Sequence, residues 1–355
     1  MSRAEILRWL REFDDERLEP LWREADRVRR EAVGDEVHLR GLVEISNCCV
    51  RSCGYCGLRR EHHELPRYRM TAEEVLACAR EGERLGYGTL VLQSGEDPAI
   101  TAQEMAGLVR RIKRETPLAV TLSLGERRDD ELRMWREAGA DRYLLRFETT
   151  NAALYARIHP ALGRTSEDRI ALLVRLREMG YEVGSGVMVG IPGQSWDDLA
   201  NDIEMFARLD LDMIGVGPFI PHPATPLGNA TAAQGSSLPS AEQVPRDART
   251  TWKTIALARL ACPRTNIPST TALAAIDAEQ GRALGLQRGA NVVMPNLTPL
   301  TYRANYDVYP GKPGTETAET FHAALVAQIQ AMERAIGAGQ GPAPAMRARA
   351  REERS

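Results

Sequence analysis

Short apolar runs and longer amphipathic segments alternate along the chain from about residue 41 to residue 294. In the longer segments apolar residues recur three and four positions apart, which predicts helices that pack by one face. The short runs are rich in β-branched residues and predict buried parallel strands. The predicted strands are 42–45, 89–93, 118–122, 142–147, 183–189, 213–216, 266–270 and 291–294. The predicted helices are 72–85, 102–115, 129–137, 166–179, 196–209, 250–261 and 275–287.

Eight strands that alternate with helices predict an α/β fold, and their number favours a (β/α)8 TIM-type barrel over an open doubly wound sheet. Two amphipathic helices within residues 3–33 predict a cap in front of the barrel. The Pro/Gly/Ser-rich segment 221–248 predicts a loop or lid over the barrel mouth. We therefore divide the chain into an N-terminal helical cap at 1–36, the barrel at 37–312, a C-terminal helix at 313–337 and a disordered tail at 338–355.

Composition excludes several classes of protein. The formal net charge of the 355-residue chain is −3, which gives no reason to expect a nucleic acid or an anionic membrane as partner. No apolar run is long enough to span a membrane, and the charged N-terminus lacks the apolar core of a signal peptide. These features predict a cytoplasmic protein with no membrane partner.

Half of the six cysteines lie within eight residues, directly after the first predicted strand. Thiolates this close on one loop can converge on a metal, and soft sulfur ligands select iron–sulfur clusters, zinc or Cu(I). Three thiolates leave one iron of a cubane cluster open for chemistry, whereas a structural zinc ion normally takes a fourth ligand at a different spacing. We favour the iron–sulfur interpretation, with zinc as the alternative. The clustered residues are Cys49, Cys53 and Cys56, while Cys48, Cys78 and Cys262 are predicted to be buried apolar groups.

Polar residues follow the predicted strands, at the barrel end where active sites lie. Glu96 follows the second strand and is a candidate to hold an ammonium group, although a solvated acid in a turn is the alternative. Arg146 and Glu148 share one face of the fourth strand, where two charges are costly unless they bind a ligand or each other. We favour a ligand. Gly186, in the fifth strand, allows the backbone to approach a ligand or a neighbouring strand closely.

The spacing Cys49-x-x-x-Cys53-x-Tyr55-Cys56 resembles that of the radical S-adenosylmethionine superfamily. Longer blocks resemble its HydE branch, whose members are maturases for the active-site cluster of [FeFe]-hydrogenase and whose relatives include methylornithine synthase and biotin synthase. The resemblance extends from about residue 35 to residue 312. The blocks are CGLRR at 56–60, RYRMT at 67–71, VLQSGEDP at 91–98, VTLSLGE at 120–126, AGADRYLLR at 138–146 and GVGPFIPHP at 215–223.

The resemblance implies a [4Fe-4S] cluster on the three clustered cysteines and S-adenosyl-L-methionine bound to its open iron. It implies no catalytic residue beyond the cluster and this cofactor. Tyr55 would lie near the adenine, Glu96 would bind the methionyl ammonium, and Glu148 and Arg169 would hold the ribose and the carboxylate. The cofactor-binding set is Tyr55, Ser94, Glu96, Ser123, Glu148, Arg169 and Gly186.

The resemblance also implies the reaction. One-electron reduction would cleave the cofactor to methionine and a 5′-deoxyadenosyl radical, which in HydE acts on a cysteine-bound Fe(CO)2(CN) unit. The implied partners are this small organometallic substrate, other hydrogenase maturases and an electron donor such as ferredoxin or flavodoxin. The implied substrate residues are Arg146, Phe147, Thr270, Thr271, Tyr302, Arg303 and Tyr306.

The chain departs from the HydE pattern at Phe147, where histidine is typical, and in segment 223–248, which is longer and more polar. These departures keep open a HydE-like or methylornithine-synthase-like enzyme that acts on another small substrate. An alternative of a different class is a non-catalytic iron–sulfur carrier, which would bind no S-adenosylmethionine.

Overall fold

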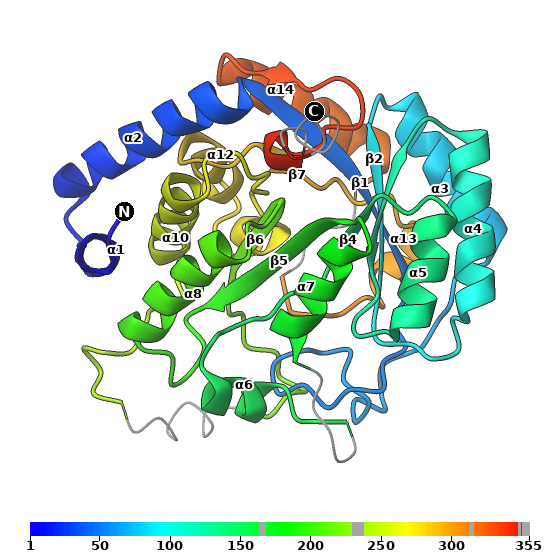
Figure 1. The fold of residues 1–355 in the computed structure, drawn as a ribbon, viewed down its shortest axis with the longest axis horizontal. Coiled ribbons are helices and arrows are strands. Elements are labelled where there is room, and N and C mark those ends of the chain that lie inside the picture. Colours follow the sequence, from blue (N-terminus) through cyan, green and yellow to red (C-terminus); the bar gives the residue numbers. More distant parts are fainter. Residues whose placement is uncertain (163–167, 229–237, 312–315, 347–348, 350–355) are drawn as a thin grey trace.

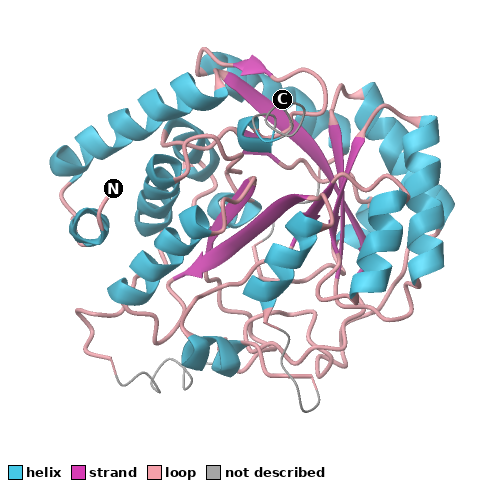
Figure 2. Ribbon diagram, viewed as in Figure 1, coloured by secondary structure: helices cyan, strands magenta, loops and turns pink. Residues whose placement is uncertain are grey.

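A computed structural model gives the fold and describes residues 1–162, 168–228, 238–311, 316–346 and 349. Helices surround a ring of parallel strands (Figure 1, Figure 2). The strands are β1 Glu36–Ser46, β2 Thr89–Ser94, β3 Ala119–Ser123, β4 Arg142–Leu144, β5 Glu182–Val189, β6 Met213–Pro218, β7 Val292–Val293 and β8 Ala335–Ile336. The helices are α1 Arg3–Leu10, α2 Asp15–Val33, α3 Ala72–Arg84, α4 Ala102–Glu115, α5 Asp129–Glu137, α6 Ala152–Ile158, α7 Arg169–Glu178, α8 Trp196–Arg208, α10 Ala248–Ala261, α11 Thr271–Ile276, α12 Gly281–Gln287, α13 Leu300–Arg303 and α14 Ala318–Ala331.

The strands pair in parallel in the order β6-β5-β4-β3-β2-β1-β7. Residues 266–269 close the ring between β6 and β7 through single bridges, from Met213 to Asn266 and from Pro268 to Val292. The α/β fold and the TIM-type barrel are therefore confirmed. The predicted seventh strand is present only as these bridges, and β8 pairs with the start of β1 outside the ring.

Local sequence explains where the barrel helices begin. Thr71 and Thr101 accept hydrogen bonds from the N3 amides of α3 and α4, and the carboxylates of Glu74 and Glu104 accept from the backbone amides of these cap residues. Such capping boxes satisfy two otherwise unpaired backbone donors at each helix start. The helices differ from the prediction in three places. The short helices α6 and α13 were not indicated by the apolar periodicity, and the helix predicted at 275–287 is divided into α11 and α12.

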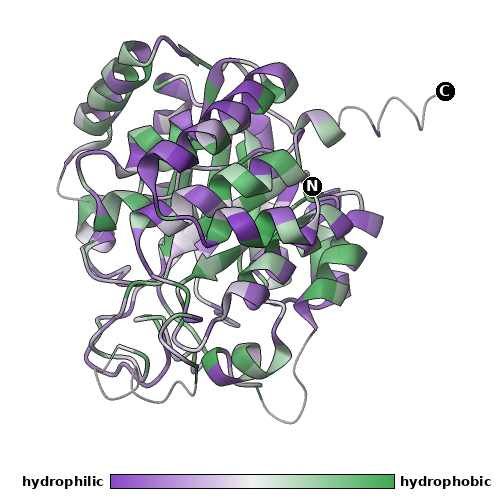
Figure 3. Ribbon diagram, turned by 90° about the vertical axis from the view of Figure 1, so that its left-hand side faces the viewer, coloured by the Kyte–Doolittle hydropathy of each residue, from purple (hydrophilic) through white to green (hydrophobic). Residues whose placement is uncertain are grey.

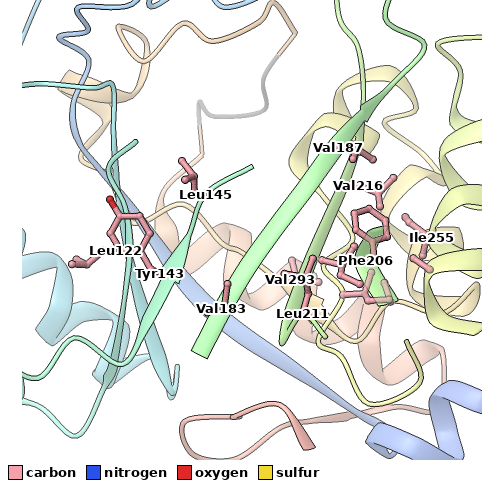
Figure 4. Packing of buried hydrophobic residues seen from close by; sticks show 14 of the residues in the cluster. Leu122, Tyr143, Leu145, Val183, Val187, Phe206, Leu211, Val216, Ile255 and Val293 are labelled. Atoms are coloured by element: carbon pink, nitrogen blue, oxygen red, sulfur yellow. The ribbon is translucent and has the colours of Figure 1, made fainter. Parts of the chain in front are cut away.

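The core lies between the strands and the helices that cover them. Figure 4 shows Val187 and Val216 from neighbouring strands facing Phe206 of α8 and Ile255 of α10, all fully buried. Burial of each such side chain is worth about 1.5–3 kcal/mol. Hydrophilic and hydrophobic residues alternate along the helices in Figure 3, as expected for helices that pack by one face. Within the described residues no helix has both the length and the apolar character that crossing a membrane requires.

Both predicted N-terminal helices are present, and they pack against α8 and α10. The buried ammonium of Lys253 in α10 donates to the carbonyl oxygens of Leu10, at 2.5 Å, and Glu12, at 2.8 Å. These carbonyls lie at the end of α1 and just beyond it, where no intrahelical donor is available. One buried cation therefore fastens the cap to the barrel.

Residues 338–346 lie under the barrel, at the end where the strands begin. The carbonyl oxygen of Gly341 accepts from Arg40 Nη2 at 3.0 Å, and the amide of Ala343 donates to Glu182 Oε1 at 2.9 Å. Ala343 has no exposed surface. We call this segment the floor segment. The prediction that the tail is disordered is wrong for these residues, and the last six residues lie outside the described part.

Deletion of residues 338–355 is expected to destabilise the barrel by at least about 3 kcal/mol. Arg40, Glu182 and Asn266 would each keep a buried polar atom without its partner in the floor segment. Each loss of this kind costs about 1–3 kcal/mol. The free energy of unfolding in urea measures the effect. A chain that ends at Arg349 keeps the floor segment and should match the full chain within about 0.5 kcal/mol, and equal stability of both truncations would contradict the prediction.

Candidate active site

A cavity of about 280 Å³ lies inside the barrel. Its wall is formed by side chains from the strands, and Tyr55 brings the cysteine loop to its rim. The wall is mainly apolar, with polar and charged side chains set among the apolar ones, as is usual for a small-molecule site. The polar and charged side chains are Arg40, Glu44, Gln93, Thr121, Ser123, Arg146, Glu148, Asn266, Thr270, Thr271, Tyr306 and Tyr309.

The cysteine loop follows β1 and is held against the end of β2. The amide of Gly95 donates to Ser46 O at 3.1 Å, and the amide of Val50 donates to Glu96 O at 3.0 Å. A Cβ atom at residue 95 would lie 2.3 Å from Cys48 O and 2.7 Å from Cys49 Cβ, so only glycine fits there. The loop thus has a fixed position at the mouth of the barrel.

The three thiols of the loop suit a metal cluster. Burial raises the pKa of Cys49, Cys53 and Cys56, that of Cys56 to about 12, and the charges of the neighbouring thiolates act in the same direction on Cys53 and Cys56. Such thiols stay protonated at neutral pH unless a metal replaces the proton. The donor set therefore fits a group of high positive charge.

The spacing of the thiols favours a cluster over one zinc ion. With Zn–S bonds of about 2.3 Å, sulfur atoms on one tetrahedral zinc lie roughly 3.8 Å apart. Among the described residues, ligand atoms lie within 4.8 Å of one another in the trio Glu96, Glu126 and His159. The three cysteine sulfur atoms do not meet this limit, so at least two of them are farther apart than 4.8 Å. Wider spacing and three protein ligands fit a cluster with one open iron.

Glu148 follows β4 in a strained conformation. Its φ is +62°, a region that non-glycine residues seldom occupy. Its carboxylate lines the cavity, and its Oε2 lies 3.1 Å from Arg146 Nη2 in an ion pair that lacks the geometry of a hydrogen bond among the described residues. Arg146 Nε is likewise buried without an acceptor. Both predicted alternatives hold in part, because the two residues form an ion pair and keep unsatisfied atoms in the cavity region for a ligand.

Asp202 of α8 supports the turn that carries Glu148. Its Oδ1 accepts from the amide of Thr150 at 2.6 Å, from Thr150 Oγ1 at 2.7 Å and from Thr149 Oγ1 at 3.4 Å. Its Oδ2 accepts from Gln194 Nε2 at 3.4 Å. Burial raises the pKa of Asp202 to about 7, although the bonds from Thr150 oppose this shift. The buried carboxyl thus holds the strained turn from behind the cavity.

A network of buried charges lies beside the cysteine loop. Arg51 pairs with both Glu96 and Glu126, and Arg169 pairs with the same carboxylates at 3.3 and 2.8 Å. Ligand atoms of Glu96, Glu126 and His159 lie within 4.8 Å of one another, but two guanidinium groups already neutralise this set. Burial and the Glu126 carboxylate raise the pKa of Glu96. Glu126 has a pKa of about 2, because the charges of Arg169 and Arg51 and the hydrogen bond from Arg169 outweigh the effect of burial.

Acid is expected to remove the stabilisation that the Glu126 ion pairs provide. The folded pKa, about 2, lies below the ordinary value of 4.5, so the stabilisation is complete above about pH 4.5 and is lost as the pH falls toward 2. Unfolding free energies of the wild type and Glu126→Gln, measured between pH 7 and 3, test this. Their difference should be constant above pH 4.5 and should shrink below it, whereas a constant difference throughout would refute the assignment.

The structure brings most of the predicted site residues to the cavity or to the charge network. Tyr55, Ser123, Glu148, Arg146, Thr270, Thr271 and Tyr306 line the cavity, and Glu96 and Arg169 belong to the network. Ser94 lies at the end of β2, where its hydroxyl donates to Gly95 O.

Four predicted site residues lie elsewhere. Phe147 is buried in the core against Phe206, with ring centroids 5.7 Å apart, because side chains alternate between the two faces of β4 and its extension. Tyr302 stacks on Tyr68, and Arg303 binds carbonyl oxygens outside the cavity. A Cβ atom at Gly186 would lie 2.0 Å from Gly215 O, so this glycine serves close strand packing.

Sequence reasoning missed Arg51, His159 and Arg40. Arg51 stands inside the cysteine motif, which was a usable signal. His159 caps the short helix α6, which apolar periodicity did not indicate. Arg40 lies near the start of β1 and reaches the cavity from below, a position that a search of strand ends cannot find.

Residues 43–206 match the family model of the Radical SAM superfamily, the class that the barrel and its cysteine loop define. Over 294 residues the chain is 47% identical to the [FeFe] hydrogenase maturase subunit HydE of Thermotoga maritima, covering 83% of this chain and 80% of that protein. The chain belongs to the HydE family of radical SAM enzymes.

More distant relatives share the architecture. The chain is 30% identical to 3-methylornithine synthase of Methanosarcina barkeri, over 82% of this chain and 79% of that protein. The crystal structure of methylornithine synthase (PylB) matches with a TM-score of 0.79 and 24% identity, covering 95% of this chain and 94% of that one. At that identity the likeness concerns the fold alone.

Proposed function

We propose that this enzyme reductively cleaves S-adenosyl-L-methionine at a [4Fe-4S] cluster and acts in the maturation of [FeFe]-hydrogenase. The observation that carries the proposal is a three-cysteine loop at the rim of a barrel cavity, in a chain 47% identical to a hydrogenase maturase. Cys49, Cys53 and Cys56 would hold the cluster. When bound, the cluster supplies the electron that converts the cofactor to methionine and a 5′-deoxyadenosyl radical.

The residues beside the loop suit the cofactor's charged groups. Glu96, whose pKa is raised by burial and by the Glu126 carboxylate, gains a partner when an ammonium group approaches, because opposite charge favours its ionised form. Arg169 is a fork of donors that matches a carboxylate, and in this structure the fork is held by Glu126 and Glu96, the carboxylates that the cofactor's carboxylate would join. Glu148 Oε2 is ion-paired with Arg146 but accepts no hydrogen bond among the described residues, so it can accept one from a ribose hydroxyl. Tyr55 at the rim and Ser123 on the cavity wall complete the proposed set.

The cavity suits a small polar or organometallic substrate. Arg146 offers a positive charge to an anionic ligand, and Thr270, Thr271 and Tyr306 offer hydroxyl groups. The floor segment closes the barrel below, so the wall residues can exclude water from a radical. We assign the substrate to the cysteine-bound Fe(CO)2(CN) class, delivered by another maturase, and the electron to ferredoxin or flavodoxin. Phe147 lies in the core, so its departure from histidine gives no reason to assign another substrate.

A two-stage experiment tests the proposal. The protein is reconstituted anaerobically with iron and sulfide, reduced, and supplied with S-adenosylmethionine, and 5′-deoxyadenosine is measured. The loaded protein is then added to apo-hydrogenase and the other maturases, and hydrogen evolution is measured. Absence of 5′-deoxyadenosine would favour an iron–sulfur carrier. Formation of 5′-deoxyadenosine without hydrogenase activation would favour another small substrate.

Glu96→Gln is expected to weaken binding of S-adenosylmethionine by about 1.5–3 kcal/mol, since it removes a charge-assisted hydrogen bond to the ammonium group. Calorimetric titration of the anaerobic reconstituted protein measures the affinity. Glu64→Gln, an exposed change beyond the cysteine loop, provides a matched control that should leave the affinity unchanged. Equal affinities of the Glu96 variant and the wild type would remove the ammonium role from Glu96.

A further inference from the structure

The imidazole of His159 lies between a cysteine of the loop and a buried arginine. His159 Nδ1 is 3.0 Å from Cys53 Sγ, and His159 Nε2 is 3.0 Å from Arg169 Nη2. His159 is 3% exposed, and Cys53 and Arg169 are buried as well. Because none of these three groups is open to solvent, protein groups supply their polar contacts, and Arg169 is further held by Glu126 and Glu96.

The arginine fixes which ring nitrogen carries the proton. A guanidinium group has only donors and stays protonated in proteins, so His159 Nε2 must accept the bond from Arg169. An imidazole whose Nε2 lone pair accepts a hydrogen bond carries its proton on Nδ1. His159 Nδ1 therefore donates to the sulfur of Cys53. Glu126 Oε1 also lies near Nε2, at 3.5 Å, but Arg169 Nη2 is closer, at 3.0 Å, and its contact is a hydrogen bond, so the guanidinium group sets the order of donors.

Backbone contacts hold the donor in place. The amide of Gly54, next to Cys53, donates to Ile158 O at 2.8 Å, and the amide of His159 donates to Tyr155 O at 2.8 Å. The ring of Tyr155 lies 5.2 Å from that of His159. The end of α6 is thereby fastened to the cysteine loop beside the sulfur that its histidine contacts. Figure 1 shows α6 at the same side of the barrel as this loop.

We propose that His159 is a positioning residue that donates a hydrogen bond to the Cys53 thiolate and raises the reduction potential of the cluster. The inference deepens the proposed function and rests on it, because it requires the cluster. Hydrogen bonds to the sulfurs are among the factors that set iron–sulfur potentials. Reduction adds negative charge to the cluster and its thiolates, so a bond from an N–H group stabilises the reduced form more than the oxidised form.

The test compares the cluster midpoint potential of the full-length, reconstituted wild type with two variants. His159→Phe removes the donor and keeps a ring, whereas His159→Asn keeps an N–H group near the position of Nδ1. Iron and sulfide content is measured first, and the potential is then followed by electron paramagnetic resonance during a redox titration without S-adenosylmethionine. We expect the Phe variant to have a lower potential, with a threefold to tenfold smaller ratio of reduced to oxidised cluster at a fixed potential. Tenfold corresponds to 59 mV for one electron. The Asn variant should stay close to the wild type.

Each outcome has a defined meaning. Equal potentials in all three proteins at full cluster content overturn the role of His159 and leave the proposed function intact. A wild type that assembles no cluster overturns the proposed function itself. If the Phe variant loses its iron, His159→Leu replaces it. Loss of iron in Phe and Leu with retention in Asn supports the hydrogen bond, and loss in all three overturns it.

Discussion

Replacement of Cys53 by alanine is expected to abolish cluster assembly and to lower 5′-deoxyadenosine formation by more than about 100-fold. Changes in residues that merely contact metal ligands cost 10–100-fold in metal affinity or activity, and loss of a ligand exceeds that. A chain with two thiolates cannot hold the cubane at three irons. The same result is expected for Cys49→Ala and Cys56→Ala. Iron content, the visible absorption of the reconstituted protein and the 5′-deoxyadenosine yield measure the effect.

Cys48→Ala is a matched control, because Cys48 adjoins Cys49 but its sulfur lies 3.7 Å from Tyr68 O; the residue is half-buried, and not fully buried as predicted. Cys262→Ala in the core is a second control. Both should keep full iron content. Normal cluster content in Cys53→Ala, or loss of the cluster in Cys48→Ala, would mean that the loop holds its metal through different sulfur atoms.

The ring of strands could be predicted because each strand carries its own signal. Runs such as 89–93 and 183–189 are apolar on both faces, which is the pattern of parallel strands covered by helices. The prediction was less accurate where backbone pairing with neighbouring strands, and not amino-acid composition, determines whether a residue belongs to a strand. Residues 266–269 contribute single bridges, and the fourth strand ends after Leu144, three residues before the prediction. The backbone turns there to place Glu148 at positive φ, which no periodicity reveals.

Site residues could be predicted where they belong to a recognisable motif or directly follow a predicted strand. Cys49, Cys53 and Cys56 form such a motif, and Glu96 follows a strand. Residues whose position depends on long-range contacts were not predictable. Phe147 is a different case, because its alternation with Arg146 and Glu148 already placed it on the opposite face, and this predicted cavity residue proved to be a core residue.

The floor segment shows a different limit of sequence analysis. It bonds to the barrel largely through main-chain groups, such as the Gly341 carbonyl and the Ala343 amide. Because every residue has main-chain groups, hydrogen bonds made by them leave no pattern in the sequence. A Gly/Pro/Ala-rich stretch without apolar periodicity is therefore predicted to be disordered, although this one bonds to buried charged side chains. The signal lay in the barrel instead, in buried residues such as Arg40 and Glu182 near the strand starts.

Asp202→Ala is expected to destabilise the fold by about 3 kcal/mol and to weaken S-adenosylmethionine binding about tenfold. The change leaves the buried amide of Thr150 and the side chains of Thr149, Thr150 and Gln194 without their shared acceptor. Unsatisfied buried donors cost about 1–3 kcal/mol each, and partial relaxation limits the sum. Because these bonds hold the turn at Glu148, the strained φ of +62° would relax and draw that carboxylate out of the cavity. Urea unfolding and calorimetric titration measure the two effects.

Asp202→Asn separates the support of the turn from simple loss of stability. Asparagine keeps the oxygen that accepts from Thr149 and Thr150, but it places an amino group against Gln194 Nε2. It should therefore lose about 1 kcal/mol of stability while retaining nearly normal affinity for the cofactor. If both variants lost stability in these proportions and the Ala variant still bound S-adenosylmethionine normally, Glu148 would not need its strained turn to serve the site. The strain at Glu148 would then be a property of the barrel fold and would have no part in cofactor binding.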